Sequence, residues 1–182
     1  MDDQPLPDVY RLRTAENRLQ FAFPFGATES SEAGVQAALA WLASAQSPDG
    51  HWDASDFGAG HETKTLGQDR QGAGQTADTG ITGLALLAFL GAGNTHVQGN
   101  YRETVQHGLE FLLRSQVTDG HLAGPARVFE KMYCHGIASL ALGEAFAMTG
   151  DPRLQPALRH AVEYSVAAQH PVSGGWRYQP GD

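Results

Sequence analysis

Two carboxylates and one imidazole stand where this sequence could perform acid or base chemistry. Asp78 opens one apolar segment and His135 lies near the start of another, so both side chains could reach the mouth of a cavity. Glu144 lies inside the second segment, seven residues after Ile137, and a buried carboxylate is costly unless it is paired. These three residues are the catalytic candidates of the sequence.

Each candidate also has a structural interpretation. A proton donor needs a raised pKa, whereas an acid at a helix N-terminus is favoured as the anion, so capping is the preferred role of Asp78. His135 fits a hydrogen-bonded structural histidine. Glu144 fits an ion pair with an arginine of the preceding or the following helix. For His135 and Glu144 as well, the structural interpretation is preferred, and the catalytic one stays open.

Histidine occurs eight times, but its spacing does not match a metal site. His51 and His121 follow Asp-Gly in equivalent turns, which favours two exposed turn residues one repeat apart. The sequence contains no His-Glu-x-x-His motif. Cys134 is the single cysteine, which excludes an intrachain disulfide and a cysteine-rich zinc module. The expectation is therefore a chain without a metal or another cofactor.

The composition fits one globular domain with a real core. Of 182 residues, 41% are hydrophobic and 18% are charged, and the net charge is −8. This charge argues against nucleic acid as a partner. The apolar stretch 81–93 is too short to span a bilayer, so no transmembrane segment is expected. Residues 1–5 lack the pattern of a secretion signal, and a cytoplasmic location is preferred, although the residues do not fix it.

A sequence motif that recurs three times indicates how the chain positions these candidates. In each copy a helix-like stretch with an aromatic residue ends in Gln, and a glycine turn then delivers a large apolar residue. The three copies are anchored at Gln46 with Trp52, at Gln116 with Leu122, and at Gln169 with Trp176. Such recurrence is the signature of a repeat architecture.

Apolar periodicity predicts five major helices, which alternate in character. Three segments are amphipathic: 31–45, 101–115 and the one that starts at Asp151-Pro152. Asn100 and Glu103 form a capping box at the start of the second segment, and Asp151 caps the third. The segments 78–90 and 132–148 are apolar all round and read as buried. This alternation predicts two concentric layers. The long polar loop 53–75 is typical of a functional or mobile segment.

The Gln–Gly–Trp phrases resemble the prenyltransferase/squalene-oxidase repeat of squalene–hopene cyclases and protein prenyltransferase β-subunits. The resemblance covers residues 31–182 and implies an all-α fold, an α/α toroid with inner and outer helices. Ahead of it, the prolines and apolar residues of 1–30 predict an irregular arm packed on the body. It also implies structural ties between repeats. Those tie residues are Gln46, Trp52, Gln116, Gln169 and Trp176, with Leu122 replacing the second Trp.

The same resemblance gives little support for catalysis. Cyclases of this kind carry an Asp-x-Asp-Asp motif that this chain lacks. The zinc-binding relatives bring Asp, Cys and His together, which would select Asp78, Cys134 and His135. Gly80 occupies the place where that pattern has its Cys. Whether the chain is an enzyme stays open.

The ligand and partner expectations follow from the resemblance. It implies an apolar, isoprenoid-type ligand held between the inner helices, for which the available aromatic side chains are Phe89, Tyr133 and Phe146. The alternative is a non-catalytic scaffold that binds protein or saccharide. Five helices make about half of a closed toroid, so we expect the rest of a longer chain or another copy to complete it.

Overall fold

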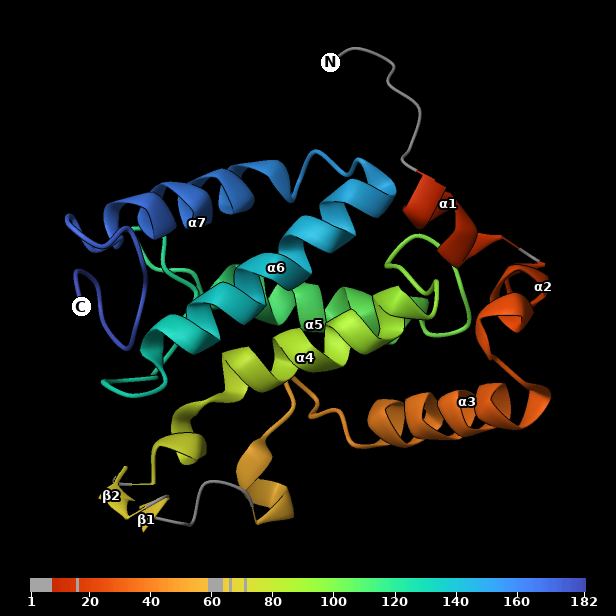
Figure 1. Ribbon diagram of the computed structural model, residues 1–182, viewed down its shortest axis with the longest axis horizontal. Coiled ribbons are helices and arrows are strands. Elements are labelled where there is room, and N and C mark those ends of the chain that lie inside the picture. The colour runs from red at the N-terminus through yellow and green to blue at the C-terminus, as the bar shows by residue number, and fades with distance from the viewer. Residues whose placement is uncertain (1–7, 16, 59–63, 66, 71) are drawn as a thin grey trace.

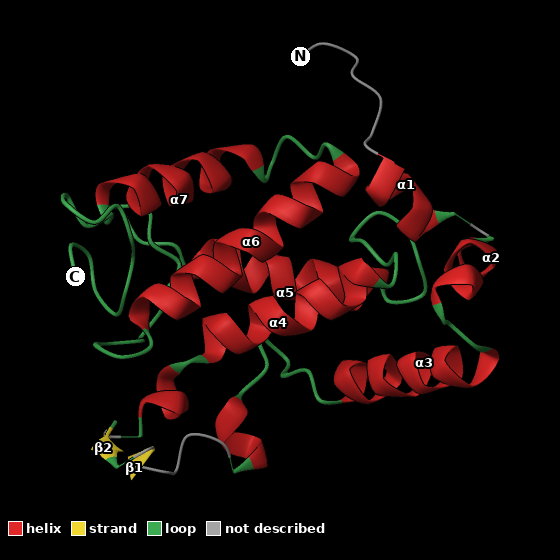
Figure 2. Cartoon of the chain, viewed as in Figure 1, coloured by secondary structure: helices red, strands yellow, loops and turns green. Residues whose placement is uncertain are grey.

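The structure, a computed structural model, describes residues 8–15, 17–58, 64–65, 67–70 and 72–182. The regular secondary structure of these residues is almost entirely helical, and loops and turns connect the helices (Figures 1 and 2). The α-helices are α1 (Asp8–Thr14), α2 (Arg18–Ala22), α3 (Glu29–Ser44), α4 (Asp78–Gly91), α5 (Arg102–Ser115), α6 (Lys131–Thr149) and α7 (Gln155–Ala167). Short 3-10 turns η1 (Phe23–Phe25), η2 (Ala54–Phe57) and η3 (Ala73–Thr76) and two antiparallel strands, β1 (Lys64–Thr65) and β2 (Gln68–Asp69), complete the set.

The five predicted helices form two layers, as expected for an α/α toroid. Inner helices α4 and α6 lie side by side in the middle, α5 lies behind them, and α7 and α3 lie along opposite edges (Figure 1). Leu86, Phe89 and Leu142 of the inner helices pack with Val105 and Leu112 of α5 in one buried core. The hydrophobic effect therefore accounts for the apolar character of the inner segments.

The inner helices are not covered all round, which corrects the expectation from their sequence. Leu84 on α4 is 51% exposed, and Tyr133 and Leu140 on α6 are 56% and 54% exposed. These side chains lie on the side of the helices that faces away from the outer layer's core. The apolar residues of α4 and α6 thus lie on two faces of these helices, one packed against the outer layer and one exposed.

Glycines set the close approach of the inner helices. A Cβ added at Gly80 would lie 3.0 Å from Cys134 Sγ, and one added at Gly83 would lie 3.0 Å from a methyl carbon of Ile137. A Cβ added at Gly108 of α5 would lie 2.9 Å from a methyl carbon of Leu86 on α4. Residues without a side chain let helix backbones pack closely, so α4 contacts both neighbours at short range.

The helix starts differ from three predicted caps. Asp78 is the first residue of α4, and Ala77 takes the N-cap position. Tyr101, not Asn100, precedes α5, with no side-chain cap bond. Asp151 lies before a turn, and α7 starts only at Gln155. Asp151 instead accepts hydrogen bonds from Arg153, so its carboxylate orders the turn.

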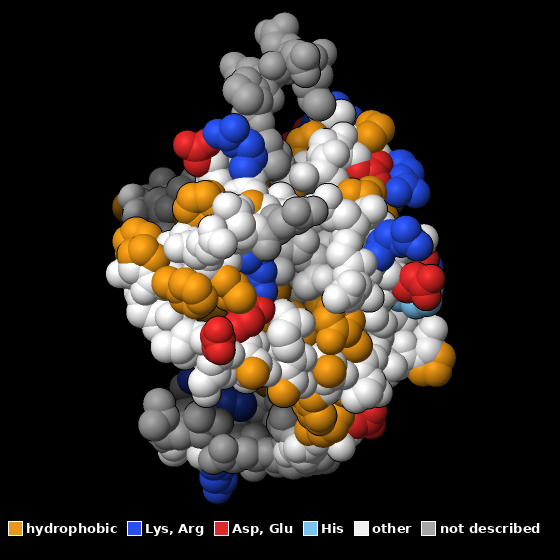
Figure 3. All heavy atoms as spheres, turned by 90° about the vertical axis from the view of Figure 1, so that its right-hand side faces the viewer, with side chains coloured by type: hydrophobic (Ala, Val, Ile, Leu, Met, Phe, Trp, Pro, Cys, Tyr) orange, Lys and Arg blue, Asp and Glu red, His pale blue; other side chains and the backbone are white. Residues whose placement is uncertain are grey.

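The N-terminal arm is helical where an irregular segment was expected. Helices α1 and α2 run across one end of the molecule, and Arg18 pairs with Glu32 of α3. Hydrophobic side chains of this end are open to the surface in several groups (Figure 3). The larger exposed ones are Val9, Leu12, Phe21, Phe23 and Phe25. The boundary at residue 30 stays a prediction.

Candidate ligand site

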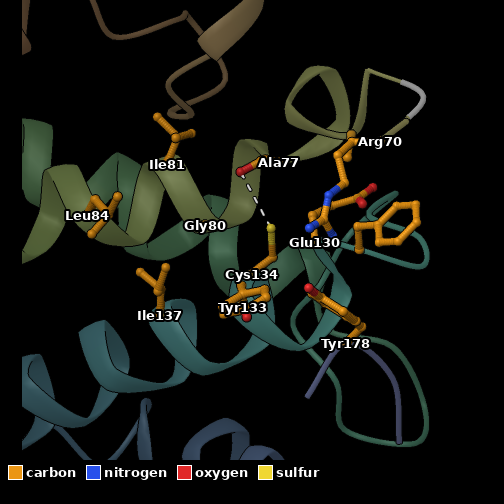
Figure 4. A pocket seen from close by; sticks show the side chains of 12 residues that line it. Arg70, Ala77, Gly80, Ile81, Leu84, Glu130, Tyr133, Cys134, Ile137 and Tyr178 are labelled. Carbon is orange, nitrogen blue, oxygen red and sulfur yellow. Dashed lines mark hydrogen bonds between the residues drawn. The ribbon is translucent and has the colours of Figure 1, made fainter. Parts of the chain in front are cut away.

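An apolar cavity of about 360 Å³ opens between the N-terminal halves of α4 and α6 (Figure 4). Ile81 and Leu84 of α4 form one wall, and Tyr133 and Ile137 of α6 form the other. Gly80 and Cys134 lie at the contact between the helices. The remaining lining residues come from the flanking loops and are Arg70, Ala73, Ala77, Phe129, Glu130 and Tyr178.

A second apolar hollow of about 300 Å³ lies on the other side of α4. Trp41 and Phe57 line it, and their rings meet edge to face at a centroid distance of 5.1 Å. Ile81 and Leu84 line both hollows, so they form a ridge between them. The two hollows therefore adjoin along α4, and apolar hollows of this kind are common ligand sites.

The three aromatic residues expected to line a ligand site lie in different places. Tyr133 lines the cavity. Phe89 is fully buried between Trp52 and Tyr101 on the side of α4 that faces the outer layer, so its assignment to the ligand was wrong. Phe146 packs against the core and does not line this cavity. A helix that is apolar all round does not reveal which of its faces is packed, and this explains the error.

The loops supply lining residues that sequence reasoning missed. Arg70 and Tyr178 lie at one end of the cavity (Figure 4), and Phe129 from a third segment contacts both side chains. Beside α4, Trp41 of helix α3 and Phe57 of the turn η2 line the second hollow together. An aromatic residue in a polar loop was the available signal, but no local pattern links these positions. The predicted loop 53–75 falls partly on residues 59–63, 66 and 71, which lie outside the described residues.

His135 is a hydrogen-bonded core residue. Its Nδ1 accepts a bond of 3.1 Å from the Leu122 N–H, so the ring proton is on Nε2, which contacts Ser165 Oγ at 2.9 Å. Ser165 Oγ donates in turn to the Ala161 carbonyl. Burial lowers the pKa of His135 to about 4. A neutral imidazole that donates to Ser165 cannot also take that hydroxyl's proton, so this geometry is structural.

Asp78 has the character of a protonatable carboxyl. Desolvation, followed by the charge of Asp53, raises its pKa, which contradicts the expected preference for the anion. Its buried Oδ1 has no hydrogen-bond partner among the described residues. The helix dipole at the start of α4 does not offset these two effects.

Glu144 pairs with the N-terminal arm rather than with an arginine of α5 or α7. Its carboxylate accepts hydrogen bonds from Arg13 and from Tyr10 Oη, at 3.3 Å for the tyrosine. The chosen ion-pair interpretation thus holds for a different partner. Because the arm precedes the repeats, no repeat pattern could have indicated this contact.

The donors of the implied zinc set do not converge. Both ring nitrogens of His135 are engaged in the core, and burial raises the pKa of the Cys134 thiol, which opposes the thiolate that zinc prefers. Within the described residues no group of three His, Cys, Asp or Glu side chains could hold a metal ion. Asp78, Cys134 and His135 therefore do not fit a zinc site.

The glutamines of the first two repeats tie their turns to the next outer helix. Gln46 Nε2 donates to the carbonyls of Gly50 and Thr104, and Gln116 Nε2 donates to those of Gly120 and Ala157. Gln169 donates to Gly174 within its own turn. The indoles of Trp52 and Trp176 bond back to the preceding helix, at the Leu42 and Ser165 carbonyls.

The histidines of the first two turns follow the same repeat. His51 stacks on Phe111 of α5, and His121 lies against Tyr164 of α7. Each ring therefore contacts the next outer helix at an equivalent aromatic residue. The two histidines lie one repeat apart, each half-buried rather than fully exposed.

Two layers of alternating helices, joined by Gln-anchored turns around an apolar hollow, define a repeat protein of the α/α-toroid class. The sequence profile of the squalene-hopene cyclase C-terminal domain matches residues 22–128, more than half of the chain. The chain belongs to this family. No curated protein and no solved structure matches it. No helix of the described residues has the length and apolar character to cross a membrane.

Proposed function

We propose that this chain is a terpenoid-cyclase-like repeat domain that binds an apolar, isoprenoid-type ligand in the cavity between α4 and α6. The observation that carries this proposal is the lining of the cavity. Ile81, Leu84 and Ile137 provide branched aliphatic contacts, and Tyr133 adds an aromatic face. Burial of this apolar surface against a hydrocarbon contributes about 25 cal/mol of binding free energy per Å².

The chemistry of the walls separates this ligand class from a saccharide. A saccharide requires many converging donors and acceptors, whereas the walls formed by α4 and α6 are apolar. The two adjoining hollows also favour an elongated molecule that crosses the ridge of Ile81 and Leu84. A linear polyprenoid fits both requirements.

The proposal assigns binding and leaves the reaction open. Asp78 is the residue best suited to hold a proton, but it does not line the cavity. A carbocation reaction would need the acid in contact with the alkene. Product analysis after incubation with squalene therefore accompanies the binding experiment.

A charge placed on the ridge tests the binding proposal. Leu84→Glu alters a half-exposed residue that lines both hollows, and Val162→Glu makes the same change at a residue of α7 with nearly equal exposure, 52%. We expect both variants to fold. Binding of squalene or geranylgeraniol is monitored by tryptophan fluorescence. The affinity should weaken at least tenfold in Leu84→Glu and stay unchanged in Val162→Glu. Absence of saturable binding to the unsubstituted protein would remove the proposal.

We further propose that the turn after α7, residues 169–176, docks onto helix α3 of a second copy. In the two earlier turns Gln contacts a carbonyl twelve residues before the next Gln, at Thr104 and at Ala157. The equivalent position before Gln46 is Gly34, which is exposed on α3. Among the described residues, Gln169 presents the same amide and donates only to Gly174 of its own turn. The amide of Gln169 and the backbone at Gly34 are thus the two partners of one contact that is not formed within the described residues. Their positions on opposite ends of the repeat favour head-to-tail pairing of two copies.

Sedimentation velocity over a range of concentrations checks this docking. We expect concentration-dependent association that Gln169→Ala weakens. Gln98→Ala, at an exposed position in the loop before α5, is the matched control. A monomer at every concentration, with the ligand site intact, would refute the docking and leave the binding proposal standing.

A further inference from the structure

One end of the apolar cavity carries a fixed positive charge. Arg70 follows β2, and its guanidinium carbon lies 4.8 Å from the centroid of the Phe129 ring and 5.2 Å from that of Tyr178. These contacts hold the guanidinium by cation–π attraction. Arg70 and Tyr178 lie at the opposite end of the cavity from Leu84 (Figure 4).

The electrostatic effect of Arg70 is visible on its neighbour. Hydrogen bonding to Arg70 and the charge of its guanidinium lower the pKa of the Tyr178 hydroxyl. An arginine side chain presents a planar fork of N–H donors that matches a carboxylate. This end of the cavity is thus suited to an anionic group.

A polar cavity of about 300 Å³ continues from the apolar one at this point. The two cavities share the lining residues Arg70, Ala73, Phe129 and Glu130. Arg127, Gln75 and Thr76 are additional lining residues of the polar cavity. An extended molecule could therefore place its hydrocarbon in one cavity and its polar end in the other, with Arg70 at the junction.

The local charges define which anion fits. Glu130 is held in place, because its Oε1 accepts bonds of 2.7 Å from Thr76 Oγ1 and from the Arg127 N–H. Arg70 and Arg127 supply two positive charges to the lining and Glu130, which lines both cavities, supplies one negative charge. Arg177 adds a positive charge outside the lining, 5.2 Å from the centroid of the Tyr178 ring. Because the Glu130 carboxylate repels a group with two or three negative charges more strongly than a monoanion, its position at the junction favours a monoanion.

We propose that the ligand is an isoprenoid-type or similarly branched carboxylic acid, with its carboxylate at Arg70 and its chain along α4 and α6. This inference rests on the proposed function and adds the class of the head group. No bond is made or broken in this step. The arginine orients the ligand and fixes which of its ends enters the apolar cavity.

Paired ligands of equal chain length test the head group. Binding of farnesoic acid and of farnesol is measured at pH 7.5, below the concentration at which either aggregates. We expect the acid to bind at least tenfold more tightly, with a preference that falls at high salt. Arg70→Gln should remove the preference. Arg159→Gln, at an exposed position on α7, should retain it.

Each outcome decides the inference. Equal binding of acid and alcohol would overturn the head group and leave the apolar site standing, whereas no binding of either would overturn both. Farnesyl monophosphate is a third ligand, and tighter binding of this more highly charged molecule would overturn the carboxylate assignment. If Arg70→Gln also loses the binding of farnesol, the Arg70→Lys variant decides the inference, because lysine keeps the positive charge and lacks the planar fork of N–H donors. Retained tenfold discrimination in Arg70→Gln would contradict the inference.

Discussion

The side-chain amide of Gln116 donates a hydrogen bond of 2.8 Å to the backbone carbonyl of Ala157, 41 residues further along the chain. The same amide also donates to Gly120, so a single side chain joins a turn to the next outer helix. Gln46 makes the equivalent pair of bonds to Gly50 and Thr104. These ties fix the spacing of α3, α5 and α7.

Removing the amide should have unequal effects in the three repeats. Gln46→Ala and Gln116→Ala each lose two hydrogen bonds and should lower the free energy of unfolding by about 1–3 kcal/mol. Gln169→Ala should cost less than about 0.5 kcal/mol in the monomer, because this exposed side chain bonds only within its turn. Urea denaturation of the three variants measures the difference. Equal losses would show that the ties between helices contribute nothing.

The glycines of the first two turns should resist substitution. Gly50 and Gly120 have φ of 98° and 96°, and an added Cβ would collide with the carbonyls of His107 and His160. Gly50→Ala and Gly120→Ala should each cost about 3 kcal/mol from the left-handed backbone and the collision together. Gly58→Ala, with φ of 75° and no described atom within 4 Å of the added Cβ, should cost only about 1 kcal/mol. Thermal unfolding compares the three, and similar values would contradict the collision.

Acid should destabilise the protein through His135. Its pKa is about 4 in the folded state and about 6.5 when unfolded, so the unfolded chain binds the extra proton between these values. The free energy of unfolding should therefore fall as the pH drops from 6.5 towards 4, by up to about 3 kcal/mol. His135→Gln should lack this part of the pH dependence. Denaturation at several pH values tests it, and identical slopes in both proteins would exclude His135 as the cause.

Loss of the Glu144 charge should release the N-terminal arm. Glu144→Gln weakens the contact with Arg13 and Tyr10, and trypsin cleavage within the arm should become about tenfold faster. Glu163→Gln, an exposed position on α7, provides the control. The repeats themselves should stay resistant. Unchanged cleavage in Glu144→Gln would show that other contacts hold α1.

The sequence predicted the layers because their cause is periodic. Residues 78–90 and 132–148 lack a polar face, and among the helices α4 and α6 hold most of the buried side chains. The Gln spacing likewise repeats with the architecture. The site was harder to predict, because Arg70, Phe129 and Tyr178 come from loops that only the tertiary structure brings together. Glu144 was identified, but its partner lies in a segment outside the repeats.

Gly83 gives the hollow its width although it is not among the residues of the wall. Its missing side chain lets α4 lie against Ile137 and Ala138 of α6. A methyl group there would push the two helices apart and enlarge the space between Leu84 and Ile137. Preference for a thinner or a bulkier hydrocarbon can therefore be tuned from a position that never touches it.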